Sequence, residues 1–406
     1  MPTLDPADWN PTDPSFRNDP YPWYEALRLN DPVHLHEGVG YVVSRFDDID
    51  WLLRSDRFQV ATPSPWRELL SSVASPALAR LGEHSLLFID PPSHSRVRSL
   101  VAKAFSPRRI QELRPDIERI TGTILDSLTV RENFDLLREV AEPIPILTIA
   151  RMLGVPDADW SALHGWSTAI TAFDELPIDF DALPGANEAA TEFASYCETL
   201  IDERRRALGD DLVSALIMAE EDGEHLDHDE LISMIMLLLI AGHDTTKSLI
   251  SNGVLSLLQH PDQAAALRAD QSLAVSAVDE LMRFESPLHV ASGGGRWSTE
   301  PMELRGVTLE PGIAVRLLLA SGNRDPDAFD DPDRLDLARS GRAHLAFGRG
   351  LHHCLGAALG RLEGQIVIPE VLRRFPDLRL VDEELVWRSS FVVRQLAYLE
   401  LSSSPA

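Results

Sequence analysis

The 406-residue chain carries 64 acidic and 37 basic side chains, which gives a formal net charge of −27, and 44% of its residues are hydrophobic. This composition is typical of a globular protein, and the negative charge disfavours nucleic acid or an anionic membrane surface as a partner. Residues 1–15 are polar and proline-rich, unlike a signal peptide, and two cysteines make no disulfide framework. We therefore expect a cytoplasmic protein without a membrane partner. We also expect it to be a monomer.

The spacing of apolar residues predicts a mainly α chain with minor β structure, an α+β fold class. Helices are expected over residues 110–128 and 190–208, then from Asp227 to His260, where Pro261 ends the helix, and again within residues 262–284. The most apolar run, residues 231–241, is too short to cross a bilayer and indicates a buried helix. Short strands are expected at residues 41–46, 302–309, 314–320 and 390–401.

The first segment of interest is DPPSHSRVR, residues 90–98. Ser93 can cap a helix, in which His94 and Arg98 then share one face because they are four residues apart. Taken alone, His94 is more typical of a polar surface histidine. A functional role for this segment is therefore indicated only in combination with the other motifs.

The run AGHDTT, residues 241–246, lies in the middle of the longest predicted helix. Glycine and threonine inside a helix cost helix propensity, so the run is either a tolerated imperfection, a helix end or a functional distortion. Apolar positions continue beyond it, which predicts that the helix persists.

Glu280 and Arg283 are three residues apart on one predicted helical face, a spacing that is typical of a surface ion pair of little energetic value. A long loop rich in proline and aspartate follows at residues 323–339. Loops of this length are usually functional.

The segment AFGRGLHHCLG, residues 346–356, contains Cys354 directly before a predicted helix. A helix N-terminus stabilises a thiolate, and the three flanking glycines let a large flat group approach the backbone. Phe347 can shield such a group from water. The residue types alone leave three alternatives for Cys354: an inert buried cysteine, a zinc ligand together with His352 and His353, or a nucleophile with a histidine base.

This segment matches the Phe-Gly-x-Gly-x-His-x-Cys-x-Gly signature of the cytochrome P450 superfamily at all six fixed positions, and the chain resembles a bacterial, soluble member of that family. The three motifs described above match further family patterns in the same order, so the resemblance covers nearly the whole chain. It implies the cytochrome P450 fold, a single triangular-prism domain over residues 1–406 with a long central helix over the haem, and with short flexible ends near residues 1–15 and 402–406. It also implies that Cys354 is the thiolate ligand of the iron of haem b.

The resemblance assigns roles to other residues as well. Asp244 and Thr245 would form an acid–alcohol pair that relays protons, so that one atom of O2 leaves as water, and Ala241 and Gly242 would leave room for oxygen. The other implied haem contacts are Phe347, Gly348, Gly356, His94, Arg98, Arg296 and His352.

The Glu280–Arg283 pair would be internal and structural in this family. An arginine from the long loop joins it, and Arg334 is the match in this sequence. Removing one partner of such a buried pair should prevent folding or haem uptake.

The implied reaction inserts one oxygen atom of O2 into a hydrophobic organic substrate, as hydroxylation, epoxidation or dealkylation. The chain has no dinucleotide fingerprint and no cysteine cluster for an iron–sulfur centre, so we expect an external ferredoxin with its reductase, or a flavodoxin, as electron donor. A peroxygenase driven by hydrogen peroxide and a non-catalytic haem sensor or carrier are the alternatives. The Asp244–Thr245 pair disfavours both.

Two surfaces are predicted on the same basis. A ferredoxin is usually acidic, so we expect a local basic patch on the thiolate side of the fold, with the candidates Lys103, Arg108, Arg109, Arg349 and Arg361. The substrate pocket would be lined by mostly apolar residues, with the candidates Leu87, Phe88, Leu237, Leu238, Ala241, Leu288, Val290, Ala291, Phe391 and Val392. Gly293 to Gly295 would widen it, which favours a bulky terpenoid, steroid or polyketide-like substrate over a small aromatic acid.

Overall fold

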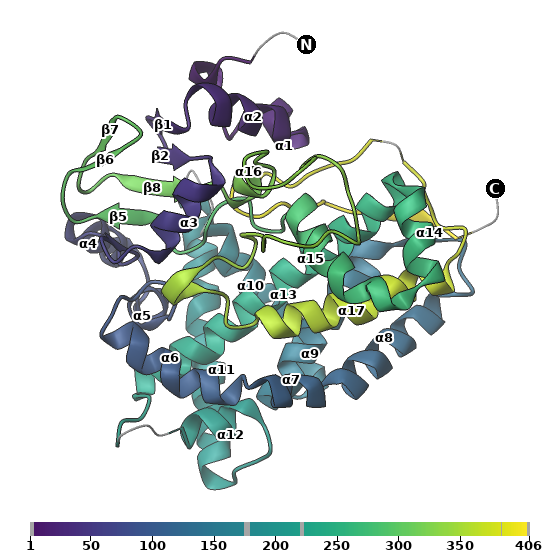
Figure 1. The fold of residues 1–406 in the computed structure, drawn as a ribbon. Coiled ribbons are helices and arrows are strands. Elements are labelled where there is room, and N and C mark those ends of the chain that lie inside the picture. The colour runs from purple at the N-terminus through teal and green to yellow at the C-terminus, as the bar shows by residue number, and fades with distance from the viewer. Residues whose placement is uncertain (1–3, 174–178, 220–222, 383, 404–406) are drawn as a thin grey trace.

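Helices dominate the structure, a computed structural model that describes residues 4–173, 179–219, 223–382 and 384–403 (Figure 1). The α-helices are α1 Pro14–Asn18, α2 Tyr21–Asn30, α3 Phe46–Arg54, α4 Ser64–Val73, α5 Pro76–His84, α6 Ser93–Ala104, α7 Pro107–Glu112, α8 Arg114–Leu128, α9 Pro143–Leu153, α10 Trp160–Phe173, α11 Leu183–Arg206, α12 Leu212–Ile217, α13 His228–Gln259, α14 Pro261–Ala269, α15 Ala274–Phe284, α16 Leu319–Asn323 and α17 Ala357–Arg374. Shorter helical turns are η1 Pro6–Asp8, η2 Leu137–Ala141, η3 Asp157–Asp159, η4 Phe180–Ala182, η5 Gln271–Leu273 and η6 Gly350–His352.

Helix α13 runs through the centre of the molecule and packs against α5, α9, α11 and α17. Its first turn is closed by a capping box, in which the Asp227 carboxylate accepts from the Glu230 N–H (2.8 Å) and the Glu230 carboxylate accepts from the Asp227 N–H (2.9 Å). Pro261 begins the next helix. The helix predicted from Asp227 to His260 is therefore confirmed, and it continues without a break through residues 241–246.

Two predicted helices are divided in the structure. Residues 110–128 form α7 and α8, because Pro115 lacks an N–H and fits only the first turn of a new helix. Residues 262–284 form α14, η5 and α15, because the Asp270 carboxylate accepts from the Ser272 N–H (2.9 Å) and turns the chain there. The helix predicted over residues 190–208 is part of α11.

The strands form three small sheets, the largest of which lies at one edge of the molecule (Figure 1). Its order is β1-β2-β8-β5-β3, with only the β2–β8 pair parallel. The second sheet has the order β4-β10-β9, and β6 and β7 form a two-stranded sheet. The strands are β1 Val33–His36, β2 Gly40–Val43, β3 Phe58–Gln59, β4 Asn133–Asp135, β5 Arg296–Ser298, β6 Met302–Leu304, β7 Val307–Leu309, β8 Ala314–Leu317, β9 Arg379–Leu380 and β10 Glu400–Ser402.

The predicted strands exist, but most are shorter than expected. Residues 302–309 form a hairpin rather than one strand, because Arg305 (φ 50°) and Gly306 (φ 80°) make a tight two-residue turn between β6 and β7. Of residues 390–401, only Glu400 and Leu401 belong to a strand, β10, and the earlier part makes single bridges to Leu288 and Trp387.

The N-terminal segment is packed against the body of the protein. Trp9 is only 2% exposed, and its ring lies 5.8 Å from that of Phe16 and 5.6 Å from that of Phe391, measured between ring centres. Trp9, which lies within the predicted flexible end at residues 1–15, is thus held by aromatic contacts, and residues 1–3 of that prediction lie outside the described residues. Within the described parts of the chain, no helix has the length and apolar character needed to cross a membrane.

Candidate functional site

A mostly apolar cavity lies between the middle of α13, the start of α17 and the segment before α17. Cys354 borders it, and its side chain is exposed to the open cavity although protein atoms surround the site. The polar side chains that line the cavity are Arg98, Thr245, Thr246, Ser292, Arg296, His352, His353, Cys354 and Glu363.

The segment before α17 forms a tight loop that presents Cys354 to the cavity. The Cys354 N–H donates to the carbonyl of Phe347 (2.9 Å), and Gly348 (φ 63°) and Gly350 (φ 67°) adopt left-handed backbone conformations. A Cβ on Gly350 would collide with the backbone carbonyl of Leu53 at the end of α3. These glycines therefore allow both the turn and the close approach of the loop to α3.

The electrostatic surroundings of the thiol differ from the prediction. Burial raises the pKa of Cys354, while the N–H of Gly356 and the guanidinium groups of Arg98 and Arg361 act in the opposite direction. The start of α17 thus favours the thiolate, as predicted, but does not outweigh burial. Among the described residues, no group of three His, Cys, Asp or Glu side chains could hold a metal ion, so the zinc alternative finds no ligand set.

Four nitrogen-bearing side chains lie near one another beside the cavity. The rings of His94 and His352 lie 4.2 Å apart, and Arg98 and Arg296 line the cavity beside them. His94 is only 1% exposed, and within the described part of the chain neither of its ring nitrogens has a hydrogen-bond partner. Buried polar groups are nearly always hydrogen-bonded in native proteins.

Charge in this cluster is only partly compensated, because Asp90 is the carboxylate that acts on Arg296 and His94. Burial lowers the pKa of Arg296 to about 10, and burial together with the nearby cations lowers that of His352 to about 3. Asp90 acts on Arg296, but its carboxylate already accepts from the N–H groups of Val60 (3.1 Å) and Ala61 (2.9 Å). The cluster therefore fits an anionic group such as the carboxylates of a haem.

Helix α6 carries two members of this cluster, but Ser93 does not cap it. Ser93 is the first helical residue and Pro92 occupies the cap position without a side-chain hydrogen bond. Arg98 donates to the backbone carbonyl of His353 (2.7 Å). His94 reaches the cavity only through its contact with His352, because it does not line the cavity itself.

The part of α13 that lines the cavity extends from Leu237 to Leu249 and includes Ala241, Gly242, Thr245 and Thr246. A Cβ on Gly242 would lie 3.2 Å from Cγ1 of Ile149, so the glycine keeps α13 close to α9. The Thr245 hydroxyl donates to the Ala241 carbonyl (3.1 Å), one helical turn earlier.

Asp244 is adjacent to Thr245 in the chain but does not line the cavity. Its Oδ1 lies 2.6 Å from Nζ of Lys247 and 3.6 Å from Nε2 of His243. Burial alone would raise the pKa of Asp244, but His243 and Lys247 lower it to about 2. The predicted acid–alcohol pair therefore contains an ionised, ion-paired carboxylate.

Glu363 on α17 is a cavity residue that the sequence analysis missed. It is 1% exposed, and in the described chain neither carboxyl oxygen has a hydrogen-bond partner. Burial raises its pKa to about 8, which the hydroxyls of Thr148 and Thr246 oppose more weakly. The available signal was its position four residues after Leu359, on the apolar face of the predicted helix.

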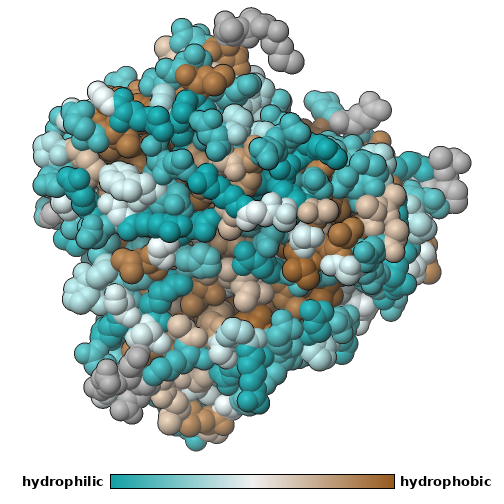
Figure 2. All heavy atoms as spheres, in the orientation of Figure 1, coloured by the Kyte–Doolittle hydropathy of each residue, from teal (hydrophilic) through white to brown (hydrophobic). Residues whose placement is uncertain are grey.

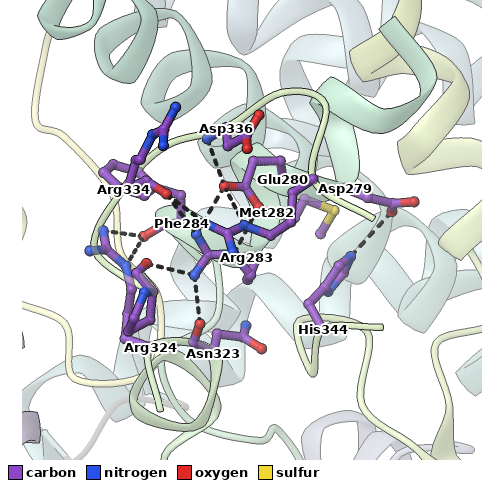
Figure 3. Close-up of polar contacts among 12 residues, drawn as sticks. Asp279, Glu280, Met282, Arg283, Phe284, Asn323, Arg324, Arg334, Asp336 and His344 are labelled. Carbon is purple, nitrogen blue, oxygen red and sulfur yellow. Dashed lines mark hydrogen bonds and ion pairs between the residues drawn. The ribbon is translucent and has the colours of Figure 1, made fainter. Parts of the chain in front are cut away.

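Glu280 and Arg283 form a buried ion pair at the centre of a network (Figure 3). Oε2 of Glu280 lies 2.7 Å from Nε of Arg283, and Oε1 lies 2.9 Å from its Nη2. Both side chains are 2% exposed, so the pair is internal, as predicted. Arg283 also donates to the carbonyls of Asn323 and Pro332, both at 2.8 Å.

The third member of this network is Arg339, which corrects the prediction of Arg334. Nε of Arg339 lies 3.1 Å from Oε1 of Glu280. Arg334 contributes its backbone carbonyl, which accepts from Arg283 (3.3 Å) and Arg339 (2.9 Å), while its side chain points away from Glu280 (Figure 3). The loop places the two arginines five residues apart, and its turn directs the second one inward.

The network continues to the loop that carries Cys354. Asn323, whose carbonyl binds Arg283, accepts the Leu345 N–H through its side-chain oxygen (2.6 Å). Asp279, next to Glu280, lies 3.2 Å from Nε2 of His344 and 2.7 Å from Nε of Arg361. The buried charges thus hold the residues that precede Cys354.

The structure sorts the predicted substrate contacts into two groups. Those that line the cavity are Leu87, Leu237, Leu238, Ala241, Leu288 and Ala291. Those that do not are Phe88, Val290, Phe391 and Val392. Val290 and Phe391 belong instead to a separate core cluster with Trp9 and Phe16.

The three consecutive glycines have a backbone role. Gly293, Gly294 and Gly295 all have positive φ (91°, 72° and 109°), which disfavours any other residue. A Cβ on Gly293 would lie 2.9 Å from the Leu87 carbonyl oxygen, and one on Gly295 would lie 2.9 Å from Nη1 of Arg316. Backbone conformation and close packing therefore explain these glycines, and the predicted widening of the substrate pocket is not needed to explain them.

The predicted basic patch divides into two parts. Lys103, Arg108 and Arg109 line a surface hollow between α6, α7 and α12. Arg361 lies over the ring of Phe347 at 4.3 Å, and Arg349 lies 3.5 Å from Asp50, so both brace the Cys354 loop. On the face shown in Figure 2, hydrophobic residues gather near the middle and hydrophilic ones surround them.

Comparisons with known proteins agree with this geometry. The family model "Cytochrome P450" matches residues 182–386. The chain is 39% identical to Cytochrome P450 107B1 of Saccharopolyspora erythraea, over 95% of this chain and 96% of that protein. It is 38% identical to Vitamin D(3) 25-hydroxylase of Pseudonocardia autotrophica, over 96% and 95%. The crystal structure of epothilone D-bound cytochrome P450epoK has a TM-score of 0.90 at 32% identity, over 98% of this chain and 100% of that one.

Proposed function

We propose, from the premise that the chain belongs to the cytochrome P450 family, that it is a monooxygenase in which Cys354 is the thiolate ligand of haem b and the adjoining cavity holds a hydrophobic substrate. The observation that carries this proposal is the position of Cys354 on the wall of a mostly apolar cavity that Arg98, Arg296 and His352 also line. When bound, haem supplies the activation of O2, so that one oxygen atom enters the substrate and the other becomes water.

The residues around the cavity fit the parts of a haem. The iron would hold the Cys354 sulfur as a thiolate, against the effect of burial, because a metal-bound thiol is deprotonated. Arg98, Arg296 and His352, which line the cavity, would bind the two propionates, and His94 would support them from behind His352. The propionates would also offset the cationic charge that now lowers the pKa of His352.

Phe347, Gly348 and Gly356 would hold the haem by contact. All three line the cavity next to Cys354. The phenyl ring would exclude water from the sulfur, and the glycines leave the backbone uncovered.

The helix α13 would supply protons to the oxygen that becomes water. Thr245 presents its hydroxyl to the cavity wall, and Asp244 lies behind it, out of the cavity. We assign the hydroxyl of Thr245 to the last donor position and Asp244 to the position before it. Ala241 and Gly242 leave the space in which oxygen would bind.

We further propose that the substrate is bulky and apolar and is hydroxylated, epoxidised or dealkylated. The leucine and alanine side chains that line the cavity support an apolar substrate. Two relatives point to large ones: one is named for vitamin D3 and the other was crystallised with epothilone D. No single residue of the cavity defines the compound.

The electron donor in this proposal is an acidic ferredoxin with its reductase, with a flavodoxin as the second choice. Lys103, Arg108 and Arg109 form the part of the basic patch that lies around an open hollow, and the side chain of Arg108 is 90% exposed. Charge reversal in Arg108→Glu/Arg109→Glu should slow reduction of the haem without changing substrate affinity. The exposed Arg57, which pairs with Glu300 outside the patch, provides the control Arg57→Glu. Equal reduction rates in both variants would refute the assignment.

One experiment tests the proposed reaction against its alternatives. Product formation from vitamin D3, epothilone D and benzoic acid is measured with O2 and a ferredoxin system, with hydrogen peroxide alone, and with neither. The proposal expects product in the first arm, from a bulky compound. Product only with peroxide would establish a peroxygenase, and haem binding without product in any arm would favour a sensor or carrier.

A further inference from the structure

A buried polar cluster lies behind the cavity-facing side of α13. It consists of Glu142, His164, His243, Asp244 and Lys247, which come from the start of α9, from α10 and from α13. Nε2 of His164 lies 2.5 Å from Oε1 of Glu142, and the rings of His164 and His243 lie 5.9 Å apart. Nε2 of His243 faces Oδ1 of Asp244 at 3.6 Å. The cluster is thus a continuous set of titratable groups that ends next to Thr245.

The hydrogen bonds of His243 determine which ring nitrogen carries the proton. Nδ1 lies 2.8 Å from the carbonyl of Leu239, and a carbonyl only accepts, so Nδ1 is the protonated nitrogen. Nε2 then carries a lone pair. It is fully buried and has no hydrogen-bond donor among the described residues. The unprotonated Nε2 of His243 and the Oδ1 of Asp244 are both acceptors, so a proton must be added before they can form a hydrogen bond.

Asp244 cannot be the resting source of a proton in this arrangement. Its carboxylate is ion-paired with Lys247 at 2.6 Å, and its pKa of about 2 leaves it ionised at neutral pH. A proton that Asp244 passes to Thr245 must first arrive from a neighbour. The unpartnered Nε2 of His243 is placed to deliver it.

The opposite end of the cluster reaches the surface. The side chain of His164 is 28% exposed and that of Glu142 is 19% exposed, whereas that of His243 is 0% exposed. Nδ1 of His164 is buried and unpartnered within the described chain. The two imidazole rings pack edge to face against each other. The pair therefore connects solvent with the interior of α13.

We propose that His164 and His243 form the proton entrance of this enzyme, in which protons pass from solvent through His164 and Nε2 of His243 to Asp244. The inference rests on the proposed relay through Asp244 and Thr245, and deepens it by naming the supply. In each cycle Nε2 of His243 accepts one proton and the imidazolium releases it to the Asp244 carboxylate. Asp244 then passes it to the Thr245 hydroxyl, which gives its own proton to the oxygen that becomes water. No group is oxidised or reduced, and each returns to its starting state.

The charged groups around His243 favour a short-lived protonated state of its imidazole. Burial lowers the pKa of its imidazolium, Asp244 opposes this shift, and Lys247 and His164 add to it. A low pKa makes the imidazolium a strong donor toward Asp244. Arg388 acts on Asp244, and Glu142 lowers the net positive charge near His164 through their ion pair.

The test compares His243→Asn with a matched histidine on the same helix. His260 makes the same bond, from Nδ1 to the carbonyl four residues earlier (Ser256, 2.8 Å), but lies at the far end of α13. The measured quantity is coupling, the fraction of electrons recovered in product rather than hydrogen peroxide, with the most productive compound of the panel above. His243→Asn should lower coupling about tenfold, since water replaces part of a donor worth about 10²-fold or more. His260→Asn should leave it unchanged.

A second measurement does not depend on turnover. In the reduced, carbon monoxide-bound holoprotein, ¹⁵N spectra of labelled histidine report the tautomer and the titration of His243. The expected result is a proton on Nδ1 at neutral pH and an imidazolium pKa that Lys247→Met raises. A proton on Nε2 at neutral pH would overturn the inference, even if His243→Asn does not fold.

The outcomes for Asp244→Asn separate the two proposals. Coupling that falls in Asp244→Asn but not in His243→Asn would overturn the entrance and leave the relay. Coupling that stays high in both would overturn the relay and the entrance together. A loss in both variants, with His260→Asn unaffected, supports the inference.

Discussion

Replacement of Arg339 by alanine should destabilise the protein, whereas the same change at Arg334 should not. Arg339 contributes an ion pair to the buried Glu280 carboxylate and donates to the carbonyls of Asp330, Asp331 and Arg334. Loss of one partner from a buried ion pair costs about 3–5 kcal/mol. Glu280 keeps its two contacts with Arg283 and the Asp336 N–H, so we expect a loss near the lower limit, about 3 kcal/mol.

The assay is the free energy of unfolding of the haem-loaded protein in urea, together with its haem content. Arg334→Ala is the matched control, because Arg334 is exposed and donates no side-chain hydrogen bond to Glu280 (Figure 3). Its change should stay within about 0.5 kcal/mol, as for ordinary surface substitutions. An equal or larger loss in Arg334→Ala than in Arg339→Ala would refute the placement of this network.

Three further predictions concern the walls of the cavity. Burial raises the pKa of Glu363 from 4.5 to about 8, so the free energy of unfolding of the wild type should fall by up to about 5 kcal/mol as pH rises from 4.5 to 8. Glu363→Gln should remove this pH dependence, as measured by urea unfolding at several pH values. An unchanged pH dependence in the variant would contradict the assignment. Arg296→Gln should speed haem transfer to apomyoglobin about tenfold, since a hydrogen bond to a charged group contributes about 1.5–3 kcal/mol, and an unchanged rate would exclude Arg296 as a propionate partner. Gly350→Ala should lower the free energy of unfolding by about 2 kcal/mol or more and reduce the haem content, because φ is +67° and the new Cβ would collide with the Leu53 carbonyl. Normal haem content in this variant would show that the loop can shift.

The sequence predicted those features of the fold that local chemistry determines. Asp227 and Pro261 mark the ends of α13 because a capping carboxylate and a missing N–H act within one turn. The break at Asp270 was missed, since nothing in the apolar periodicity of residues 262–284 indicates that its carboxylate would bind the Ser272 N–H instead of facing solvent.

The candidate site was predicted where motif spacing carries the information, and missed where tertiary packing decides. Cys354 and Thr245 face one cavity, as the motifs imply. The choice between Arg334 and Arg339 depends on how the loop turns over Glu280, which a five-residue spacing does not define. The position of Glu363 on the apolar face of α17 indicates burial, but only the packing of α17 against α13 shows that it lines the cavity.

The side of an extended segment is equally hard to predict. Leu288 and Ala291 line the cavity, whereas Val290 packs into the cluster around Trp9. All three are apolar and only a few residues apart, so hydrophobicity cannot separate them. Their assignment requires the position of the N-terminal segment, which long-range contacts determine.

The most direct test of the account is the carbon monoxide difference spectrum of the reduced protein, recorded for wild type and for Cys354→Ala. Sulfur coordination should give the long-wavelength Soret band of a thiolate-ligated haem in the wild type, and the band should be absent from the variant. The same band in both proteins, or its absence from a wild type that retains its haem, would contradict the central assignment.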